Sequence, residues 1–359
     1  MSPSMYRTSD PDTEAKIAFL AQPAAYSDRP RRVECIETHM AWVFLTDRHA
    51  FKLKKPVRYE FLDFSTVEAR RQDCALEIEL NRRLAADVYL EIVPLCVSVG
   101  GALKLGGDGE PVDWLVKMRR LPRERMLDWQ LEHRNPAPAE LRPAALLLAE
   151  FYRKAQSLEI EPQTYLHNLQ DAIDDNNSAL SLPRFGLPID VVRRVTDRQL
   201  EFLDKQSELV RERVSDRRII EGHGDLRPEH ICLVRPPVIV DCMEFKRAFR
   251  IVDPVDELAF LTVECCVLGQ TWAGELFFHT YREVTGDQPE IRLFEFYKSL
   301  RALLRAKLSV WHLRDPEVRD AGKWVARARH YLKLSSDFAS KALERTNQSA
   351  SRSTIDPSK

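Results

Sequence analysis

Alternating or continuous apolar runs predict strands along the first third of the chain. The runs are short, rich in β-branched and aromatic residues, and separated by polar or glycine-containing turns, as in an antiparallel sheet. The six expected strands cover residues 33–37, 40–46, 50–54, 89–99, 102–105 and 112–118. In the third strand Phe51 and Leu53 alternate with Lys52 and Lys54. Side chains two residues apart share a face, so the lysines lie together on the face opposite the apolar pair.

A longer period, with apolar residues every three or four positions, predicts helices elsewhere. Ser65 followed by Glu68 three residues later forms a capping box, which opens a helix that runs to Leu84. After Leu127 the chain is predominantly helical. The clearest further helices cover residues 15–20, 144–158, 191–214, 257–268, 272–284 and 291–312. The acidic run 174–177 is interpreted as a solvated loop or a helix cap.

A cluster of titratable residues lies in the second half of the chain. Two short apolar runs, 231–234 and 238–241, are joined by Pro236-Pro237 and predict a hairpin. This hairpin gathers four side chains at one end: His223, Asp225, His230 and Asp241. Such a cluster can accept a proton from a hydroxyl and hold a divalent ion, which are the two requirements of phosphoryl transfer.

These motifs resemble those of a known family. Residues 223–230, His-Gly-Asp-Leu-Arg-Pro-Glu-His, resemble the catalytic loop of the aminoglycoside phosphotransferase group of kinase-like enzymes, and Ile239-Val240-Asp241 resembles their metal-binding strand end. Segments 52–56, 118–122 and 241–245 are similar to an uncharacterised bacterial branch that is often fused to a P-loop ATP-binding domain. The resemblance implies a two-lobed, protein-kinase-like α+β fold, with an antiparallel-sheet N-lobe and a mainly helical C-lobe.

The resemblance also implies a division of the chain. We expect an N-terminal extension at 1–32 and a nucleotide-binding N-lobe at 33–121. A C-lobe at 122–345 would carry the catalytic loop and the acceptor side. The polar tail, 346–359, is predicted to be disordered.

Kinase-like folds use a lysine of the third strand to bind the nucleotide's phosphates and a helix glutamate to hold that lysine. Alternation cannot choose between Lys52 and Lys54; we favour Lys52. In the family the glutamate lies seven residues before a leucine, and Glu77 stands seven before Leu84. Glu77 is therefore the expected partner, with Glu79 in reserve.

By resemblance, backbone groups from Met118 to Leu121 would bind the adenine edge. The turn that would cover the phosphates, 38–42, contains no glycine, and the glycines within 100–109 are typical of hairpin turns. How the phosphates are held is left open. Backbone amides of the 38–42 turn are one candidate.

Within the catalytic loop, Asp225 is the expected general base and His223 is expected to fix the loop by hydrogen bonding. Arg227 has three alternatives: pairing with Asp225, contact with the γ-phosphate, or exposure to solvent.

Asp241 is the expected ligand of the Mg²⁺ that accompanies ATP. Five residues after Asp225, His230 stands where the wider family has a metal-binding asparagine. Imidazole is a softer ligand than an amide oxygen, so we expect a shift toward Mn²⁺ or the loss of one metal. Glu244 is assigned a weaker metal or ribose-side role.

Composition narrows the remaining possibilities. The chain has 359 residues, of which 44% are hydrophobic, and a net charge of −1. It can bury a core and has no basic field for nucleic acid. Seven cysteines without a C-x-x-C pair, and no apolar run near membrane-spanning length, favour a cytoplasmic protein without a membrane anchor. No GxxxxGK[ST] motif is present, so a P-loop ATPase would be a separate partner.

The sequence thus predicts an ATP-dependent phosphotransferase that acts on a hydroxyl of a small molecule. Two alternatives stay open. The glycine-free turn and His230 are compatible with a nucleotide-binding pseudokinase that acts as a regulatory module. The four clustered residues are compatible with a metal-dependent phosphohydrolase. Lys52 with Glu77 favours a kinase over the hydrolase.

Overall fold

A computed structural model describes residues 12–59, 62–98, 100–314 and 320–344. The chain forms two compact units. The first unit comprises Met1–Lys154 and His223–Ile251, and the second comprises Ala155–Gly222 and Val252–Lys359. The predicted disordered tail lies outside the described residues.

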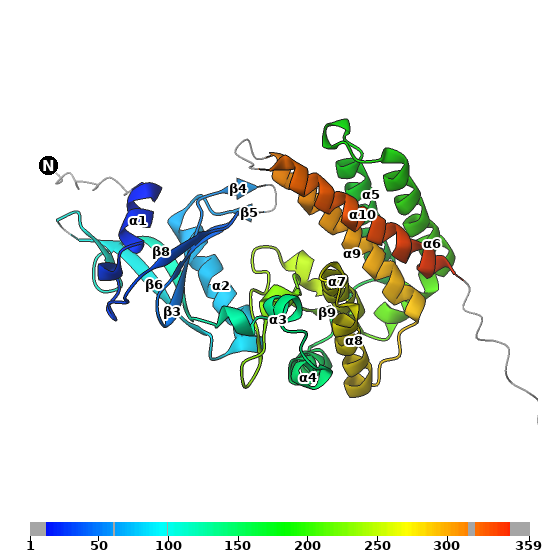
Figure 1. The fold of residues 1–359 in the computed structure, drawn as a ribbon, viewed down its shortest axis with the longest axis horizontal. Coiled ribbons are helices and arrows are strands. Elements are labelled where there is room, and N and C mark those ends of the chain that lie inside the picture. The colour runs from blue at the N-terminus through cyan, green and yellow to red at the C-terminus, as the bar shows by residue number, and fades with distance from the viewer. Residues whose placement is uncertain (1–11, 60–61, 99, 315–319, 345–359) are drawn as a thin grey trace, which may run out of the picture. The chain divides into compact units, whose positions relative to one another are not determined.

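The first unit contains a six-stranded antiparallel sheet, of which Figure 1 labels β3, β6 and β8. The strand order is β1-β2-β3-β8-β6-β7. Its strands are β1 (Glu34–Glu37), β2 (Ala41–Leu45), β3 (His49–Lys54), β6 (Tyr89–Val97), β7 (Leu103–Leu105) and β8 (Glu110–Arg119). All six predicted strands are therefore confirmed. A short hairpin of β4 (Arg58–Tyr59) and β5 (Leu62–Asp63) follows β3.

One face of this sheet packs against α1 (Thr13–Leu20). The shared core includes Leu20 from the helix and Phe51 and Leu53 from β3, all of which are buried. Lys16 fixes the helix to the sheet by donating to the Asp113 carboxylate at 2.9 Å. The predicted alternation along β3 is confirmed, because its lysines point away from this core.

The other face packs against α2 (Val67–Ala85). Cys74 and Ile78 of this helix contact Val116 of β8 in a second core. The cap is Thr66, whose hydroxyl accepts from the Ala69 amide at 3.1 Å, so the predicted cap at Ser65 is wrong by one residue. The reason is local: Asp63 accepts from both the amide and the hydroxyl of Ser65.

The rest of the first unit is built around short elements. The predicted hairpin is confirmed, with β10 (Ile231–Cys232) paired antiparallel to β11 (Val238–Ile239). The remaining elements are η1 (Pro23–Ala25), η2 (Arg123–Arg125), α3 (Leu127–His133), α4 (Pro138–Lys154), η4 (Pro228–His230) and η5 (Arg247–Arg250). β12 (Ile251–Val252) contains the last residue of the first unit and the next residue of the chain, with which the second unit resumes.

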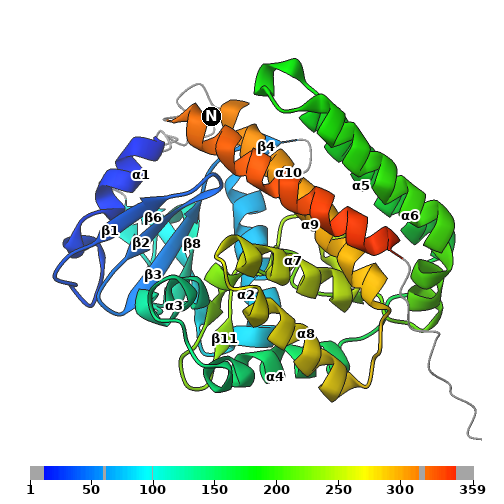
Figure 2. The ribbon, with the colours of Figure 1, turned by 45° about the vertical axis from the view of Figure 1, so that its right-hand side comes forward.

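The second unit is helical, as predicted, and α9 and α10 run side by side along it (Figure 2). Its elements are α5 (Pro162–Leu180), η3 (Pro183–Phe185), α6 (Ile189–Ser215), β9 (Ile220–Glu221), α7 (Pro254–Val267), α8 (Thr271–Thr285), α9 (Ile291–Trp311), η6 (His312–Arg314) and α10 (Ala321–Leu343).

The acidic run 174–177 lies inside α5, so its interpretation as a loop or cap is wrong. Buried Asn176 and the ion pair of Asp175 with Lys307 at 2.5 Å place this segment against α9. No described helix is both long and apolar enough for a membrane crossing.

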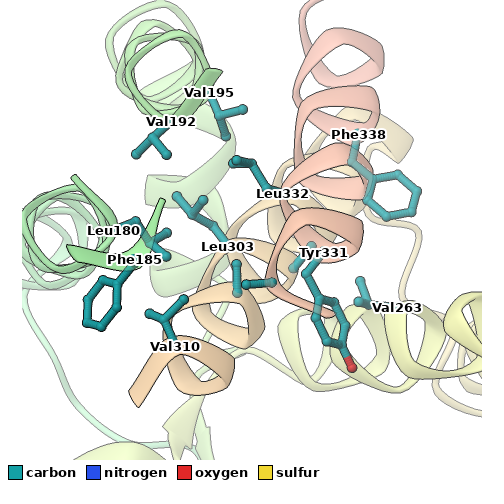
Figure 3. Close-up of a cluster of buried hydrophobic side chains, with 13 residues drawn as sticks. Leu180, Phe185, Val192, Val195, Val263, Leu303, Val310, Tyr331, Leu332 and Phe338 are labelled. Carbon is teal, nitrogen blue, oxygen red and sulfur yellow. The ribbon is translucent and has the colours of Figure 1, made fainter. Parts of the chain in front are cut away.

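The main core of the second unit joins α5, α6, α7, α9 and α10 (Figure 3). Val192 and Val195 of α6 face Leu332 of α10 in this cluster. A buried ion pair supplements it: Arg213 binds both carboxylate oxygens of Asp253 at 2.7 Å, and Asp253 also caps α7. A paired guanidinium and carboxylate satisfy each other's hydrogen bonds away from water.

Close packing of α7 and α8 predicts the effect of one substitution. A Cβ atom at Gly274 would lie 2.4 Å from the Thr262 Cα, so the backbone must move. We expect Gly274→Ala to lower the free energy of unfolding by about 1–3 kcal/mol, measured by denaturant titration. Gly322→Ala is the matched control, because a Cβ atom there would meet only Asp320 Oδ1, at 3.6 Å, which is ordinary van der Waals contact. Equal effects of the two substitutions would contradict the packing argument.

Candidate functional site

The site in the first unit is centred on Glu77, a buried residue of α2. Its Oε1 accepts from Lys52 at 2.9 Å and its Oε2 accepts from Lys54 at 2.6 Å. The lysines reach it together because they share one face of β3. Glu79, the reserve candidate, is exposed on α2.

Lys52 and Lys54 differ in their remaining partners. Lys52 donates to Asp241 Oδ1 at 3.0 Å, and its side chain is 16% exposed. Burial disfavours its charge, but the carboxylates of Asp241 and Glu77 outweigh burial and hold the pKa of Lys52 above its ordinary value. Lys52 is thus the lysine that contacts the predicted metal ligand.

Lys54 is enclosed by three carboxylates and is only 1% exposed. Besides Glu77, it contacts Asp73 at 2.6 Å and forms a short hydrogen bond with Glu244. Glu244, for which a metal or ribose-side role is predicted, is therefore engaged with a lysine in this structure. Asp73 was not predicted, although it lies four residues before Glu77 and hence on the same helix face.

Crowding around Lys54 changes the protonation of one carboxylate. Burial, with the negative charges of Glu244 and Glu77, raises the pKa of Asp73 to about 7 despite the attraction of Lys54. The pKa of Glu244 is instead lowered, because Lys54 and Lys52 together outweigh its burial. Asp73 is thus the member of the cluster that takes up a proton near neutral pH.

The predicted catalytic loop begins with His223 and Gly224. His223 Nε2 donates to the Val240 carbonyl at 2.9 Å, and its Nδ1 accepts from the Asp225 amide at 3.3 Å. Burial and nearby His230 lower the pKa of His223 to about 4, so the ring is neutral at physiological pH. Gly224 has φ +87° and lies against Arg250 and Met243, where a side chain would not fit. Both ring nitrogens of His223 thus hold the loop.

Arg227 pairs with Asp225, which is the first of the three alternatives considered for this arginine. Nη2 of Arg227 contacts Asp225 Oδ2 at 2.9 Å, and Nη1 contacts Glu229 at 2.6 Å. The Asp225 side chain is 24% exposed. The predicted base therefore carries a guanidinium partner at its carboxylate.

His230 connects Asp225 to Asp241. Its Nδ1 donates to the Asp225 carbonyl at 2.8 Å. In a neutral imidazole the other nitrogen, Nε2, then carries a lone pair. Nε2 accepts from Arg227 Nη2 at 3.2 Å and lies 3.4 Å from Asp241 Oδ2. The ring thus places an acceptor nitrogen, now bonded to Arg227, beside the Asp241 carboxylate.

Asp241 is held by its backbone as well as by its carboxylate. Its φ of +61° lies in the left-handed region, which non-glycine residues rarely adopt. The Asp241 amide donates to the Tyr89 hydroxyl at 3.0 Å, and the Cys242 amide donates to Asn81 Oδ1 at 2.8 Å. Sequence reasoning missed Asn81 and Tyr89, which lie far from residue 241 along the chain.

The residues around Asp241 fit a divalent ion in part. Two lysines face four carboxylates, and protonation of Asp73 removes only part of the surplus negative charge. Lys52 lowers the pKa of Asp241, so its half-exposed carboxylate is ionised. The described residues contain no group of three His, Cys, Asp or Glu side chains that could enclose a metal alone. Asp241 and His230 therefore suit an ion that takes its other ligands from phosphates and water, as Mg²⁺ commonly does.

The predicted nucleotide-contacting segments lie at the edges of this cluster. Met118 is in β8, paired with Ala50 and Tyr89, and it packs in the α2 core together with Leu121. In the 38–42 turn, the Thr38 amide donates to the Ala41 carbonyl at 2.8 Å and the Ala41 amide to the Thr38 hydroxyl at 3.0 Å. These two amides donate within the turn, so fewer of its backbone amides remain to bind a phosphate.

The raised pKa of Asp73 predicts a pH-dependent stability. Asp73 binds a proton more tightly in the folded chain, so the stability it contributes is present below its unfolded pKa and is lost as the pH rises through about 7. Compared with the wild type, Asp73→Asn should gain on the order of 1–3 kcal/mol of unfolding free energy between pH 5 and pH 8. Thermal or urea unfolding of both proteins across this range measures the difference. A constant difference would contradict the raised pKa, and Asp171→Asn, an exposed residue, is the control.

Comparison with known proteins adds sequence relatives. No protein-family model matches the chain. Uncharacterised proteins of Mycobacterium bovis and Mycobacterium tuberculosis are 34% identical over 279 residues, which is 77% of this chain and 54% of each relative. The chain therefore spans about half the length of the curated relatives it matches.

Solved structures share the fold at low sequence identity. A GDP and kanamycin complex of an aminoglycoside phosphotransferase has a TM-score of 0.53 and 17% identity, covering 91% of this chain and 99% of that chain. The GDP complex of aminoglycoside 2'-phosphotransferase-IIIa has a TM-score of 0.56 and 16% identity over the same shares. A choline/ethanolamine kinase family protein from Mesorhizobium loti has a TM-score of 0.53 and 17% identity, covering 91% and 98%. The predicted kinase-like α+β fold class is thereby confirmed.

Proposed function

We propose that this protein is an ATP-dependent kinase that transfers a phosphoryl group to a hydroxyl of a small molecule. The observation that carries the proposal is the contact of Lys52 with both Glu77, at 2.9 Å, and Asp241, at 3.0 Å. A strand lysine held by a helix glutamate beside a metal-binding aspartate is the arrangement with which kinases bind nucleotide phosphates.

Each residue has a defined task in the proposed reaction. Lys52 would bind phosphate oxygens, with Glu77 holding its ammonium group in position. Asp225 would accept the proton of the acceptor hydroxyl, and Arg227 would keep that carboxylate oriented.

Asp241 and His230 would hold the metal, which supplies positive charge against the phosphates when bound. His223 would keep the loop in shape through its backbone contacts.

The phosphohydrolase alternative needs His223 as one of four ligands for two metals. His223 is fully buried, and both of its ring nitrogens bind backbone groups of the loop, the Val240 carbonyl and the Asp225 amide, so it could bind a metal only by releasing the loop. The ion pair of Lys52 with Glu77 would also have no task in such an enzyme. The geometry therefore favours the kinase. No comparison bears on a separate P-loop ATPase partner, which stays a prediction.

Nucleotide binding is the first test, because it does not require the acceptor. With ATP or GTP at about 100 times its Kd, linkage stabilises the folded state by about 2.7 kcal/mol and raises the Tm by several degrees. We expect this rise for ATP with Mg²⁺ or Mn²⁺, measured by thermal unfolding. Asp241→Asn, which keeps the shape of the side chain, should abolish the metal-dependent part. No rise with ATP in either metal, in a folded protein, would contradict the proposal.

The imidazole ligand predicts a distinct metal preference. Nitrogen ligands favour Mn²⁺ over Mg²⁺ more than amide oxygens do. We expect His230→Asn to lower the ratio of ATP affinity in Mn²⁺ to that in Mg²⁺, measured by titration calorimetry in each metal. His167→Asn changes a largely exposed histidine of the second unit and serves as the control. An unchanged ratio in His230→Asn would show that the imidazole does not bind the metal.

A further inference from the structure

We propose that Asn81 and Tyr89 are positioning residues that hold the backbone of Asp241 and Cys242, and so aim the Asp241 carboxylate at a metal-bound nucleotide. The inference rests on the proposed function and assigns a task to two residues outside the motifs. It follows from the hydrogen bonds at a strained turn.

The strain is local to Asp241. Its φ of +61° costs free energy for a residue with a side chain, so surrounding contacts must hold it. Two consecutive amides are held: Asp241 by the Tyr89 hydroxyl at 3.0 Å and Cys242 by Asn81 Oδ1 at 2.8 Å. The turn is thus fixed from two different elements, the end of α2 and the start of β6.

The orientation of Asn81 is itself determined. Its Nδ2 donates to the Glu77 carbonyl at 2.9 Å, which turns Oδ1 toward the Cys242 amide. Asn81 is 1% exposed and Tyr89 is 2% exposed, so both bonds lie away from water. A buried amide that lost either partner would have no solvent replacement, which makes these bonds selective for one backbone conformation.

The same face of α2 controls both halves of the site. Asp73, Glu77 and Asn81 are spaced by four residues and so lie in one row on the helix. The first two bind the lysines of β3, and the third binds the segment that carries Asp241. One rigid helix therefore sets the position of the phosphate lysine and of the metal ligand together.

A further contact joins the catalytic loop to this turn. The Cys242 thiol donates to the His223 carbonyl at 3.2 Å, and His223 donates to the Val240 carbonyl at 2.9 Å. Residues 240–242 are therefore held on both sides. If the backbone at Asp241 were free to move, the Asp241 carboxylate would lose its position first, because this side chain is 48% exposed.

The test compares Tyr89→Phe and Asn81→Ala with the wild type. Without nucleotide, hydrogen exchange of the amides in residues 240–244 should speed up roughly three- to tenfold in both variants, the effect of losing one or two buried hydrogen bonds. The control is Tyr26→Phe, which removes another buried hydroxyl of the first unit, bonded to the Leu20 carbonyl at 2.6 Å. Unchanged exchange at 240–244 would overturn the inference without touching the proposed function.

The second readout is ATP affinity in Mg²⁺ and in excess EDTA. Tyr89→Phe should weaken binding about three- to tenfold in Mg²⁺ and leave binding in EDTA unchanged. In an Asp241→Asn background it should have no further effect, because the carboxylate that it aims is gone. Equal losses with and without metal, or additive effects of the two substitutions, would indicate a purely structural role and overturn the inference.

These outcomes separate the two claims. A wild type that binds no nucleotide contradicts the kinase and the metal-aiming role together, while the exchange measurement still decides whether the turn is held as described. If Asn81→Ala does not fold, Tyr89→Phe, which removes a single oxygen atom, carries both measurements.

Discussion

The candidate site depends on one buried carboxylate, that of Glu77, which binds two lysines at once. Taking two ammonium groups and a carboxylate out of water is costly unless each finds partners of opposite charge. Glu77 can serve both lysines because its two oxygens point to successive lysines on one face of β3. The remaining carboxylates then divide between them, Asp241 beside Lys52 and Asp73 with Glu244 around Lys54.

This division gives the two lysines different characters. Lys54 is enclosed and fully compensated, so it ties β3, α2 and the segment after Asp241 into one body. Lys52 keeps partial contact with solvent and faces Asp241, whose carboxylate is half exposed. A ligand that brings phosphates and a divalent ion could compete for Lys52 and Asp241, whereas Lys54 would stay where it is. The cluster thus combines an enclosed lysine with one that retains contact with solvent.

Local signals in the sequence accounted for much of the fold. Strands of alternating character, the hairpin around Pro236 and the helices after Leu127 follow from side-chain periods that act over a few residues. The same local rules misplaced the α2 cap, because the Ser65 hydroxyl donates to Asp63 instead of capping the helix. They also misassigned 174–177, because the helix there is stabilised by burial of Asn176 and by an ion pair with Lys307, which lies far away in the sequence. Tertiary contacts override local preference in such segments.

For the site, the sequence by itself determined the residue types and faces: lysines two apart on a strand, a glutamate on the following helix, and histidines and aspartates at one end of a hairpin. Only the tertiary structure decided their partners. It placed Asp73 and Glu244 around Lys54, closed Arg227 onto Asp225, and brought Asn81 and Tyr89 to the amides of Cys242 and Asp241, across more than 150 positions of sequence. The physical reason is that the period of the side chains indicates only which face of an element is buried. A hydrogen bond forms only when the donor–acceptor distance is right to within a few tenths of an ångström, and the segments that supply these donors and acceptors meet only in the folded chain.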